Sequence, residues 1–175
     1  MRLWQDPNAR RSGFSLLELM ATTAIMATLM TACVVLVGSG YTVWTAYEQD
    51  VAVTESAYAV LRHLVRELRQ ADSVSVISAA SDTSGDLSIV RADLSTESWS
   101  INSGLKTVYV NTGSGNQVLA TGINQLIFVG YEADGVTTTT TVTDIHAVKC
   151  TVQITLTQGG GTTRLVSCIG WVRSW

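Results

Sequence analysis

Proline, histidine and charged side chains are scarce in this chain of 175 residues, which has one proline, two histidines and 14% charged residues. His63 and His146 lack neighbours with the spacing of a metal site, and the sequence has no nucleophile elbow, phosphate-binding loop or metalloprotease motif. We therefore predict that the protein is not an enzyme, with no catalytic residue, metal or cofactor.

Basic residues are also few, and none occurs between Arg11 and Arg62. The formal net charge is −3, so the sequence offers no basic surface for nucleic acid and no polybasic patch for anionic lipid. Neither nucleic acid nor a small-molecule substrate is expected as a partner. The predicted partners are other proteins.

The longest apolar run covers residues 14–37, where Ser15, Glu18 and a few threonines are the polar residues. As a helix, this run is long enough to cross the hydrocarbon core of a bilayer. An ionised carboxylate in lipid costs about 2.5–3.5 kcal/mol even on the most lenient scale. Glu18 therefore predicts a functional site with a cationic partner.

The charges that precede this run indicate its orientation. Arg2, Arg10 and Arg11 are opposed only by Asp6. Because positively charged flanks stay on the cytoplasmic side, the residues after the run are predicted to be exported.

The segment Gly13-Phe14-Ser15-Leu16-Leu17-Glu18-Leu19-Met20 resembles the type IV prepilin signal that pilins share with the pseudopilins of type II secretion. The resemblance implies that a prepilin peptidase cleaves after Gly13 and methylates the new amino group of Phe14. It also implies that Glu18 pairs with the N-terminal amine of a neighbouring subunit during assembly. The cation expected for Glu18 would then come from another chain.

Other interpretations of the same segment were weighed. Arg10 and Arg11 are compatible with a twin-arginine export signal, the residues before Cys33 resemble a lipoprotein cleavage box, and a plain signal anchor is a third option. However, a secretory signal has about 7–15 apolar residues, whereas this run continues past Cys33 and carries Glu18. Cys33 is better interpreted as a small apolar residue that faces lipid or a neighbouring helix.

Four parts of the chain are predicted: a leader (1–13), the transmembrane part of a long helix (14–37), an amphipathic stalk helix (38–72) and a β-rich head (73–175). The head is rich in Thr, Ser, Val and Gly, which favours strands and turns. The predicted fold class is α+β, with the N-terminal helix packed against a mostly antiparallel head. Gly38-Ser39-Gly40 predicts a kink or a locally melted turn, since glycine inside a helix costs about 1 kcal/mol relative to alanine.

Beyond these glycines, apolar residues recur at spacings of three and four, which predicts an amphipathic stripe that packs against the head. The stripe consists of Val51, Thr54, Tyr58, Leu61, Val65 and Leu68. Arg62, Arg66 and Arg69 share another side of the helix, and we interpret them as a solvated face, with a subunit contact as the alternative. His63 and Glu67, four residues apart, are predicted to form a surface pair.

Seven strands are predicted in the head, at residues 73–77, 87–91, 98–101, 106–110, 125–131, 145–157 and 163–172. Residues 137–141 are a threonine run that we expect in an exposed loop or at a sheet edge. Residues 118–128, followed by Tyr131, Asp134-Gly135 and two terminal strands, are similar to the head of J-type minor pseudopilins and related minor pilins. This second resemblance places the J-type subunit first among the minor subunits.

The two terminal strands also carry two of the three cysteines. Residues 148–156 alternate apolar and polar side chains, and Gly159-Gly160-Gly161 supplies a turn before the return strand. If Leu156 lies opposite Thr162, then Cys150 lies opposite Cys168 with both side chains on one face. We predict a disulfide between them, with two thiols packed as small hydrophobes as the alternative.

Acidic residues in the predicted turns, such as Asp82, Asp86, Glu132, Asp134 and Asp144, are candidates for binding calcium. They lack the dense, alternating oxygen ligands of a calcium loop, so solvated turns are the preferred interpretation.

These observations lead to one predicted function. The chain resembles a minor pseudopilin of a type II secretion system, most similar to the J-type subunit. That resemblance implies a single-pass protein of the bacterial inner membrane with its head in the periplasm, which assembles with major and minor pseudopilins at a filament tip. The alternatives are a minor pilin of a type IV or competence pilus and, from another class, a membrane-anchored lipoprotein, binding protein or enzyme.

Overall fold

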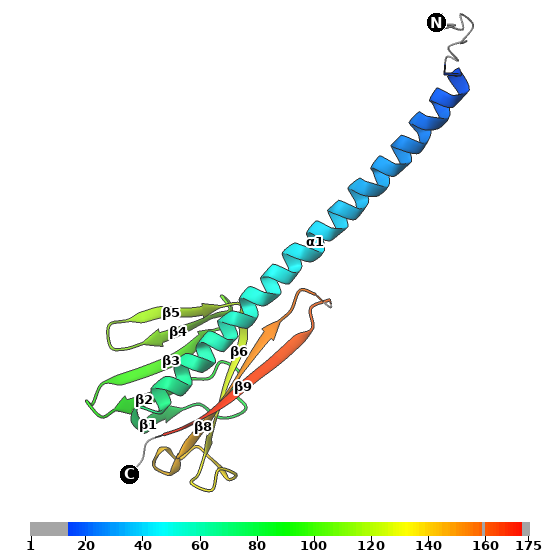
Figure 1. The fold of residues 1–175 in the computed structure, drawn as a ribbon. Coiled ribbons are helices and arrows are strands. Elements are labelled where there is room, and N and C mark those ends of the chain that lie inside the picture. Colours follow the sequence, from blue (N-terminus) through cyan, green and yellow to red (C-terminus); the bar gives the residue numbers. More distant parts are fainter. Residues whose placement is uncertain (1–13, 159, 173–175) are drawn as a thin grey trace, which may run out of the picture. The chain divides into compact units, whose positions relative to one another are not determined.

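A computed structural model describes residues 14–158 and 160–172, which form two compact units. The N-terminal unit comprises residues 14–44 and the C-terminal unit begins at Thr45. Helix α1 (Leu16–Leu68) contributes to both units, and every strand belongs to the C-terminal unit. A long N-terminal helix followed by antiparallel sheets confirms the predicted α+β class (Figure 1).

The helix is unbroken at Gly38-Ser39-Gly40, so the predicted melted turn is wrong. The hydroxyl of Ser39 donates to the carbonyl of Leu36 at 3.0 Å, which keeps this polar group inside the helical pattern. The cost of about 1 kcal/mol for each glycine is therefore not enough to interrupt the helix at this point.

The first sheet is an antiparallel meander in the order β1-β2-β3-β4-β5. Its strands are β1 (Ala71–Ile77), β2 (Leu87–Arg91), β3 (Thr96–Asn102), β4 (Thr107–Asn111) and β5 (Asn116–Thr121). Four of them match predicted strands within about two residues, and β2 matches at both ends. The sequence prediction missed β5, whose first three residues are all exposed and show no alternation.

The second sheet has the order β7-β6-β8-β9. It contains β6 (Ile123–Tyr131), β7 (Thr138–Thr139), β8 (Ala147–Thr155) and β9 (Thr163–Trp171), with a short 3₁₀ helix, η1 (Val142–Asp144), before β8. The threonine run forms β7 at a sheet edge, as expected. Leu156 donates its N–H to the carbonyl of Thr162, and Cys150 lies opposite Cys168, so the predicted hairpin register is confirmed.

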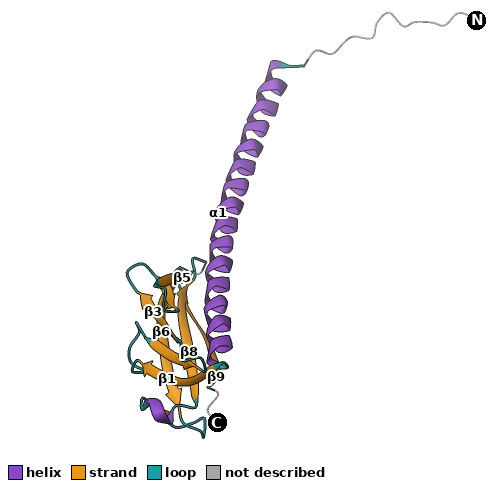
Figure 2. Ribbon diagram, turned by 90° about the vertical axis from the view of Figure 1, so that its left-hand side faces the viewer, coloured by secondary structure: helices purple, strands orange, loops and turns teal. Residues whose placement is uncertain are grey.

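The core of the C-terminal unit lies where the last turns of α1 meet both sheets (Figures 1 and 2). Trp99 and Phe128, one from each sheet, are completely buried in it. The apolar side chains that α1 buries there are Ala57, Val60, Leu61, Leu64 and Leu68. Burying a large apolar side chain stabilises the fold by about 1.5–3 kcal/mol, so this stripe is the main attachment of α1 to the sheets.

The buried stripe is rotated from the predicted one. Leu61 and Leu68 are buried as predicted, but Val51 and Tyr58 are exposed. Two adjacent lines on the helix have spacings of three and four, and the buried line includes Ala57, whose methyl group adds little to a hydrophobic pattern. The buried line of α1 packs in one core with residues of both sheets.

Two glycines allow the close approach of α1 to the strands. A Cβ at Gly170 of β9 would lie 2.8 Å from Cδ1 of Leu68, and one at Gly122 would lie 2.9 Å from a methyl carbon of Val53. Gly122 also has a φ of +80°, which other residues rarely adopt. Glycine at these positions therefore sets how near the helix lies to both sheets.

Candidate assembly interface on the N-terminal helix

Phe14 lies two residues before the start of α1, and Glu18 lies in the first turn of this helix. The backbone N–H groups of Glu18 and Leu19 both donate to the carbonyl of Ser15, at 3.0 and 3.1 Å, which closes the first turn. Phe14 is 78% exposed, and Glu18 is exposed as well. A carboxylate in a first helical turn is stabilised by the free N–H groups of the helix start, which explains why an acid is tolerated there.

The hydroxyl groups of the N-terminal unit bond within the helix. Thr22 donates to the carbonyl of Leu19 at 2.9 Å, and Thr28 donates to that of Ile25 at 2.8 Å. Thr23, Thr31, Ser39 and Thr42 likewise donate to carbonyls three or four residues earlier. These side chains therefore add little polar surface to the outside of the helix.

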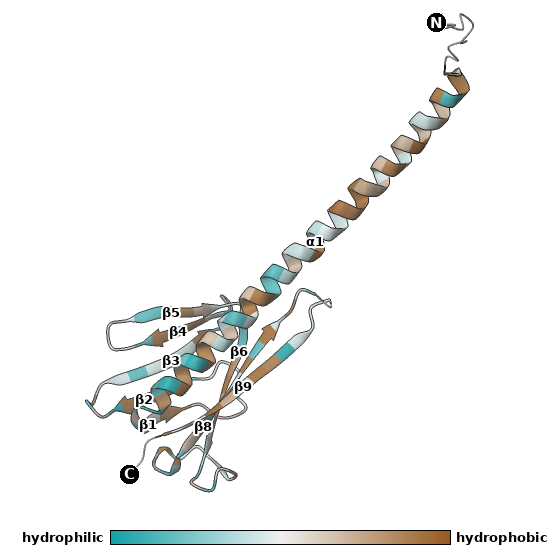
Figure 3. Cartoon of the chain, viewed as in Figure 1, coloured by the Kyte–Doolittle hydropathy of each residue, from teal (hydrophilic) through white to brown (hydrophobic). Residues whose placement is uncertain are grey.

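The Glu18 carboxylate differs from these hydroxyls because it has no hydrogen-bond or ion-pair partner among the residues that the structure describes. The side chains around it are apolar and exposed, including those of Leu17, Leu19 and Met20. Figure 3 shows that hydrophobic residues dominate the surface of the helix in this unit. An unpaired acid on an apolar surface is suited to bind a cation from outside the chain.

The apolar surface of this unit is long enough to span a membrane. An 18-residue window of α1 reaches a mean hydropathy of 2.1, and none of that window is buried. By length and composition, this segment fits a single-pass membrane anchor. The predicted residues Arg10, Arg11 and Gly13 lie outside the described residues, whereas Cys33 is exposed on the helix.

The two head cysteines lie together, as their register requires. Both are free thiols in this structure, and the Cys168 thiol donates weakly to the carbonyl of Leu61, with an S···O distance of 3.9 Å. Burial raises the pKa of Cys150 well above its ordinary value, with the neighbouring Cys168 adding to the effect. Burial also raises the pKa of Cys168, against a hydrogen bond from the Cys150 backbone. Both groups therefore favour the protonated form, which reacts slowly.

Two of the acidic residues considered as calcium ligands, Asp82 and Asp134, bond within their own turns. Asp134 accepts the N–H groups of Val136 and Thr137, each at 2.9 Å, and the Thr137 hydroxyl. These bonds, with the hydroxyl contributing most, lower the pKa of Asp134. Asp82 accepts the N–H and the hydroxyl of Ser84, both at 2.9 Å. Among the described residues, no group of three or more His, Cys, Asp or Glu side chains is arranged to hold a metal ion.

The sequence analysis missed a buried ionic cluster between α1 and the first sheet. Glu67 of α1 and Glu97 of β3 are only 4% and 2% exposed, and both bind the guanidinium of Arg91 on β2. The Arg91 Nη2 to Glu67 Oε2 distance is 2.5 Å, and Arg66 adds a contact to Glu67 at 2.8 Å. The predicted pair of His63 and Glu67 is present, but it does not lie at the surface, since Glu67 is buried and its closest partners are arginines.

His63 completes this cluster from the side of Trp99. Its Nε2 lies 4.0 Å from Glu67 and 3.8 Å from Glu97, and its ring meets Trp99 edge-on with centroids 6.0 Å apart. Burial raises the pKa of Glu97. The charges of Arg91 and His63 act to lower this pKa, and the charge of Glu67 acts to raise it further. The cluster ties α1 to β2 and β3. One signal could have revealed it: Glu67 follows Val60 and Leu64 on the buried line of the helix.

Comparison with known proteins gives one finding about the N-terminal residues. The family model described as the prokaryotic N-terminal methylation motif matches residues 8–34, which include Gly13, Phe14 and Glu18. No curated protein matches the chain. The chain thus carries the methylation motif of prepilin-type proteins, followed by a long apolar helix, and that motif implies processing by prepilin peptidase and assembly with other pilin-like subunits.

Proposed function

We propose that this protein is a minor pseudopilin of a type II secretion system, of the J type, that assembles with other major and minor pseudopilins at the tip of a short filament. The observation that carries this proposal is the coincidence of the methylation motif with an exposed apolar segment of α1, residues 16–44, whose one carboxylate, Glu18, has no partner among the described residues. A helix of this kind gains a charge-assisted bond and apolar contacts when it packs among similar helices.

The proposed maturation gives Glu18 its partner. Prepilin peptidase removes residues 1–13 by cleavage after Gly13 and methylates the amino group of Phe14. The new cation is then placed at the membrane surface, where the Glu18 carboxylate of an adjacent subunit can accept its proton in a hydrogen bond. Two groups that are costly in lipid become one pair, and this pairing favours the assembled state over the free subunit.

The proposed topology follows from the same processing. Residues 14–37 cross the bacterial inner membrane once, residues 38–72 continue as the stalk helix, and residues 73–175 form the head in the periplasm. In this compartment Cys150 and Cys168 can be oxidised to a disulfide across the β8–β9 hairpin, since their register places them directly opposite each other.

Mass spectrometry of the protein from native membranes tests the maturation. The expected chain begins at N-methylated Phe14, and a Gly13→Val variant in the same strain should keep its leader because the cleavage site is blocked. A chain that begins at a lipidated Cys33, or one that retains Met1 while other prepilins are processed, would overturn the proposal.

A minor pilin of a type IV or competence pilus is the second candidate, because the methylation motif is common to prepilin-type proteins. Deletion of the gene in the native host separates the two. Loss of secretion of folded proteins, restored by the wild-type chain but not by Gly13→Val, supports the secretion role. Normal secretion with loss of pili or of DNA uptake assigns the protein to the second candidate.

A further inference from the structure

Strand β9 is an open sheet edge that differs from the other three. Each sheet has two end strands, which are β1 and β5 in the first sheet and β7 and β9 in the second. The pairing of β1 has two register shifts, the pairing of β5 has one, and β7 is only two residues long. In contrast, β9 pairs with β8 over nine residues without a shift. Native proteins usually protect such long, regular edges, because their free N–H and C=O groups pair readily with another strand.

The sequence of β9 gives this edge little protection, since Arg164 is the one charged residue of the strand. The strand contains no proline and no lysine, and Leu165, Ile169 and Trp171 are each more than half exposed. Proline and charged side chains are the usual devices that prevent an edge from pairing with another chain. Among the described strands, β8 is the one that β9 pairs with, so its second edge is available.

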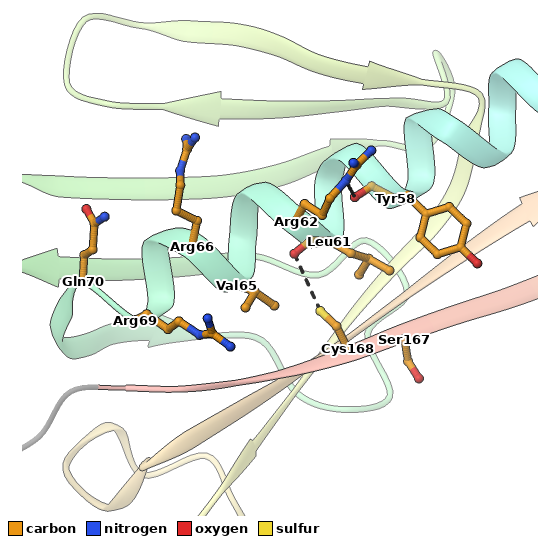
Figure 4. A pocket seen from close by; sticks show the side chains of 9 residues that line it. All are labelled: Tyr58, Leu61, Arg62, Val65, Arg66, Arg69, Gln70, Ser167 and Cys168. Atoms are coloured by element: carbon orange, nitrogen blue, oxygen red, sulfur yellow. Dashed lines mark hydrogen bonds between the residues drawn. The ribbon is translucent and has the colours of Figure 1, made fainter.

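An apolar groove of about 470 Å³ lies beside this edge, between α1 and β9. Leu61 and Val65 of α1 and Cys168 of β9 form its floor, and Tyr58 closes one end (Figure 4). The groove therefore lies where the buried Leu61 meets the more exposed flank of α1. A strand added to β9 would direct every second side chain into it.

The charges around the groove favour an acidic occupant. Arg62, Arg66 and Arg69 line it, and no carboxylate does. Arg66 is bound to Glu67, but the Arg62 guanidinium contacts only the carbonyl of Tyr58, at 3.3 Å, and Arg69 has no side-chain partner among the described residues. In Figure 4, Arg69 lies on the side of α1 that faces β9, whereas Arg66 points away from the strand.

The same charges disfavour a second copy of β9 as the occupant. The strand carries Arg164 and no acid, so two copies of β9 paired edge to edge would add cations to a region that already has them. An adjoining hollow near Arg164 contains Asp50 and Glu55, but the Asp50 carboxylate is bound to the N–H groups of Thr157 and Gln158. Both acids belong to α1 rather than to β9, so a second β9 strand would bring no negative charge of its own to the groove.

We propose that β9 accepts an extended acidic segment of a different protein as an additional strand. The main chain of that segment bonds to the open edge of β9, an apolar side chain enters the groove between Leu61, Val65 and Cys168, and flanking carboxylates bind Arg62 and Arg69. These arginines are seven residues apart, which is about 10 Å along a helix. Side chains on one face of a strand are two or four positions apart, or about 7 or 13 Å, so acids four positions apart, with an apolar residue midway, bracket the groove. This surface belongs to the C-terminal unit and does not depend on the proposed function.

A labelled peptide, Thr-Glu-Thr-Val-Thr-Glu-Thr, tests the proposal against the full-length protein in detergent micelles, with fluorescence anisotropy as the readout. The expected result is saturable binding that weakens about tenfold or more when lysine replaces both glutamates, in keeping with about 1.4 kcal/mol for each factor of ten. A peptide with methylated backbone nitrogens should also bind about tenfold more weakly, because it cannot form the strand pairing.

Charge exchange provides the matched control. The double variant Arg62→Glu and Arg69→Glu should reverse the preference and bind the lysine peptide better, whereas Lys106→Glu, in the turn between β3 and β4, should leave the wild-type preference unchanged. No binding of the glutamate peptide would overturn the proposal. Equal binding of the glutamate and lysine peptides, or of the backbone-methylated peptide, would overturn it as well.

Discussion

Two glutamates of the same helix, Glu18 and Glu67, occupy opposite surroundings. Glu18 is exposed among exposed apolar side chains and has no partner within the described residues. Glu67 is buried in the C-terminal unit and binds Arg66 and Arg91. The difference teaches that a costly charge is kept either because the fold supplies its counter-ion or because another chain does. Only the second case points to assembly.

Replacement of the unpaired acid should have the largest effect on assembly. Glu18→Leu removes a charge-assisted hydrogen bond of about 1.5–3 kcal/mol, so recovery of partner subunits from membranes should fall about 10- to 100-fold while the head unfolds as in the wild type. Quantitative co-purification measures this effect. The control is Thr28→Leu, because the Thr28 hydroxyl is already bound to the carbonyl of Ile25. Equal recovery of partners with both variants would remove Glu18 from assembly.

Loss of the internal counter-ion should instead reduce stability. Arg91→Met leaves Glu67 and Glu97 buried without their shared cation, and the loss should be about 3 kcal/mol, the lower end for a broken buried pair, because the Arg91 side chain keeps 31% exposure. Urea unfolding of the full-length protein in micelles measures it. Arg62→Met is the control and should change stability by less than about 0.5 kcal/mol. If both variants are equally stable, the cluster does not hold α1 to the sheets.

A disulfide between the hairpin cysteines should also stabilise the head, by joining β8 to β9. A bond between Cys150 and Cys168 closes a loop of about 19 residues, which corresponds to roughly 3 kcal/mol less any distortion of the hairpin. Alkylation before and after reduction, followed by mass spectrometry, should detect no free head thiols in the exported protein. A Cys150→Ala, Cys168→Ala variant gives the reference for stability. Two alkylatable thiols in the natively exported protein would contradict the bond.

The pH dependence of the free energy of unfolding should reveal the raised pKa of Glu97. Its pKa is raised from the ordinary 4.5, chiefly by burial, so the folded state holds this proton more tightly than the unfolded chain does. The resulting stabilisation is present below pH 4.5 and is lost as the pH rises through the raised pKa. Compared with Glu97→Gln, the wild type should therefore lose stability as the pH rises above about 4.5. Parallel pH profiles of the two proteins would show that Glu97 does not titrate with folding.

The smallest effect on stability is expected at the tip of the β8–β9 hairpin, where Asp50 of α1 binds Thr157 and Gln158. Burial acts to raise the pKa of Asp50, but bonds from the N–H groups of Thr157 and Gln158 outweigh it and lower the pKa. Asp50→Asn should weaken these bonds and speed hydrogen exchange at both amides, without a change in the centre of β8. Unchanged exchange at Thr157 would show that the tip is held by other contacts.

Local patterns in the sequence were enough to predict most strands and the hairpin register. The alternation in β8 and the glycine turn after it specify which residues face each other, and the pairing of Cys150 with Cys168 follows from them. The strand β5 was missed because its exposed first half has no alternation to detect. The strands with one buried face were therefore predicted, whereas the largely exposed strand β5 was not.

The ionic cluster could not be predicted because its members are far apart in the chain. Glu67 meets Arg91 and Glu97 only after β2 and β3 fold back on α1, 24 and 30 positions later. The sequence does show that Glu67 lies on a line with Val60 and Leu64, but not that two sheets would cover this line. Phe14 and Glu18 were accessible to prediction because their spacing is local.

The bonds of the threonines to their own helix affect how neighbouring subunits could align. In a bundle of such helices, the hydroxyls of Thr22, Thr28 and Thr31 have little to gain from a neighbour, since their protons are already bound. Apolar side chains recur at every turn of these helices, so several axial positions bury similar apolar area. The axial position of each subunit would then be fixed mainly by one charge, as a single buried polar residue fixes the register of a coiled coil. Moving that charge by one helical turn should shift the subunit by about 5.4 Å along the bundle.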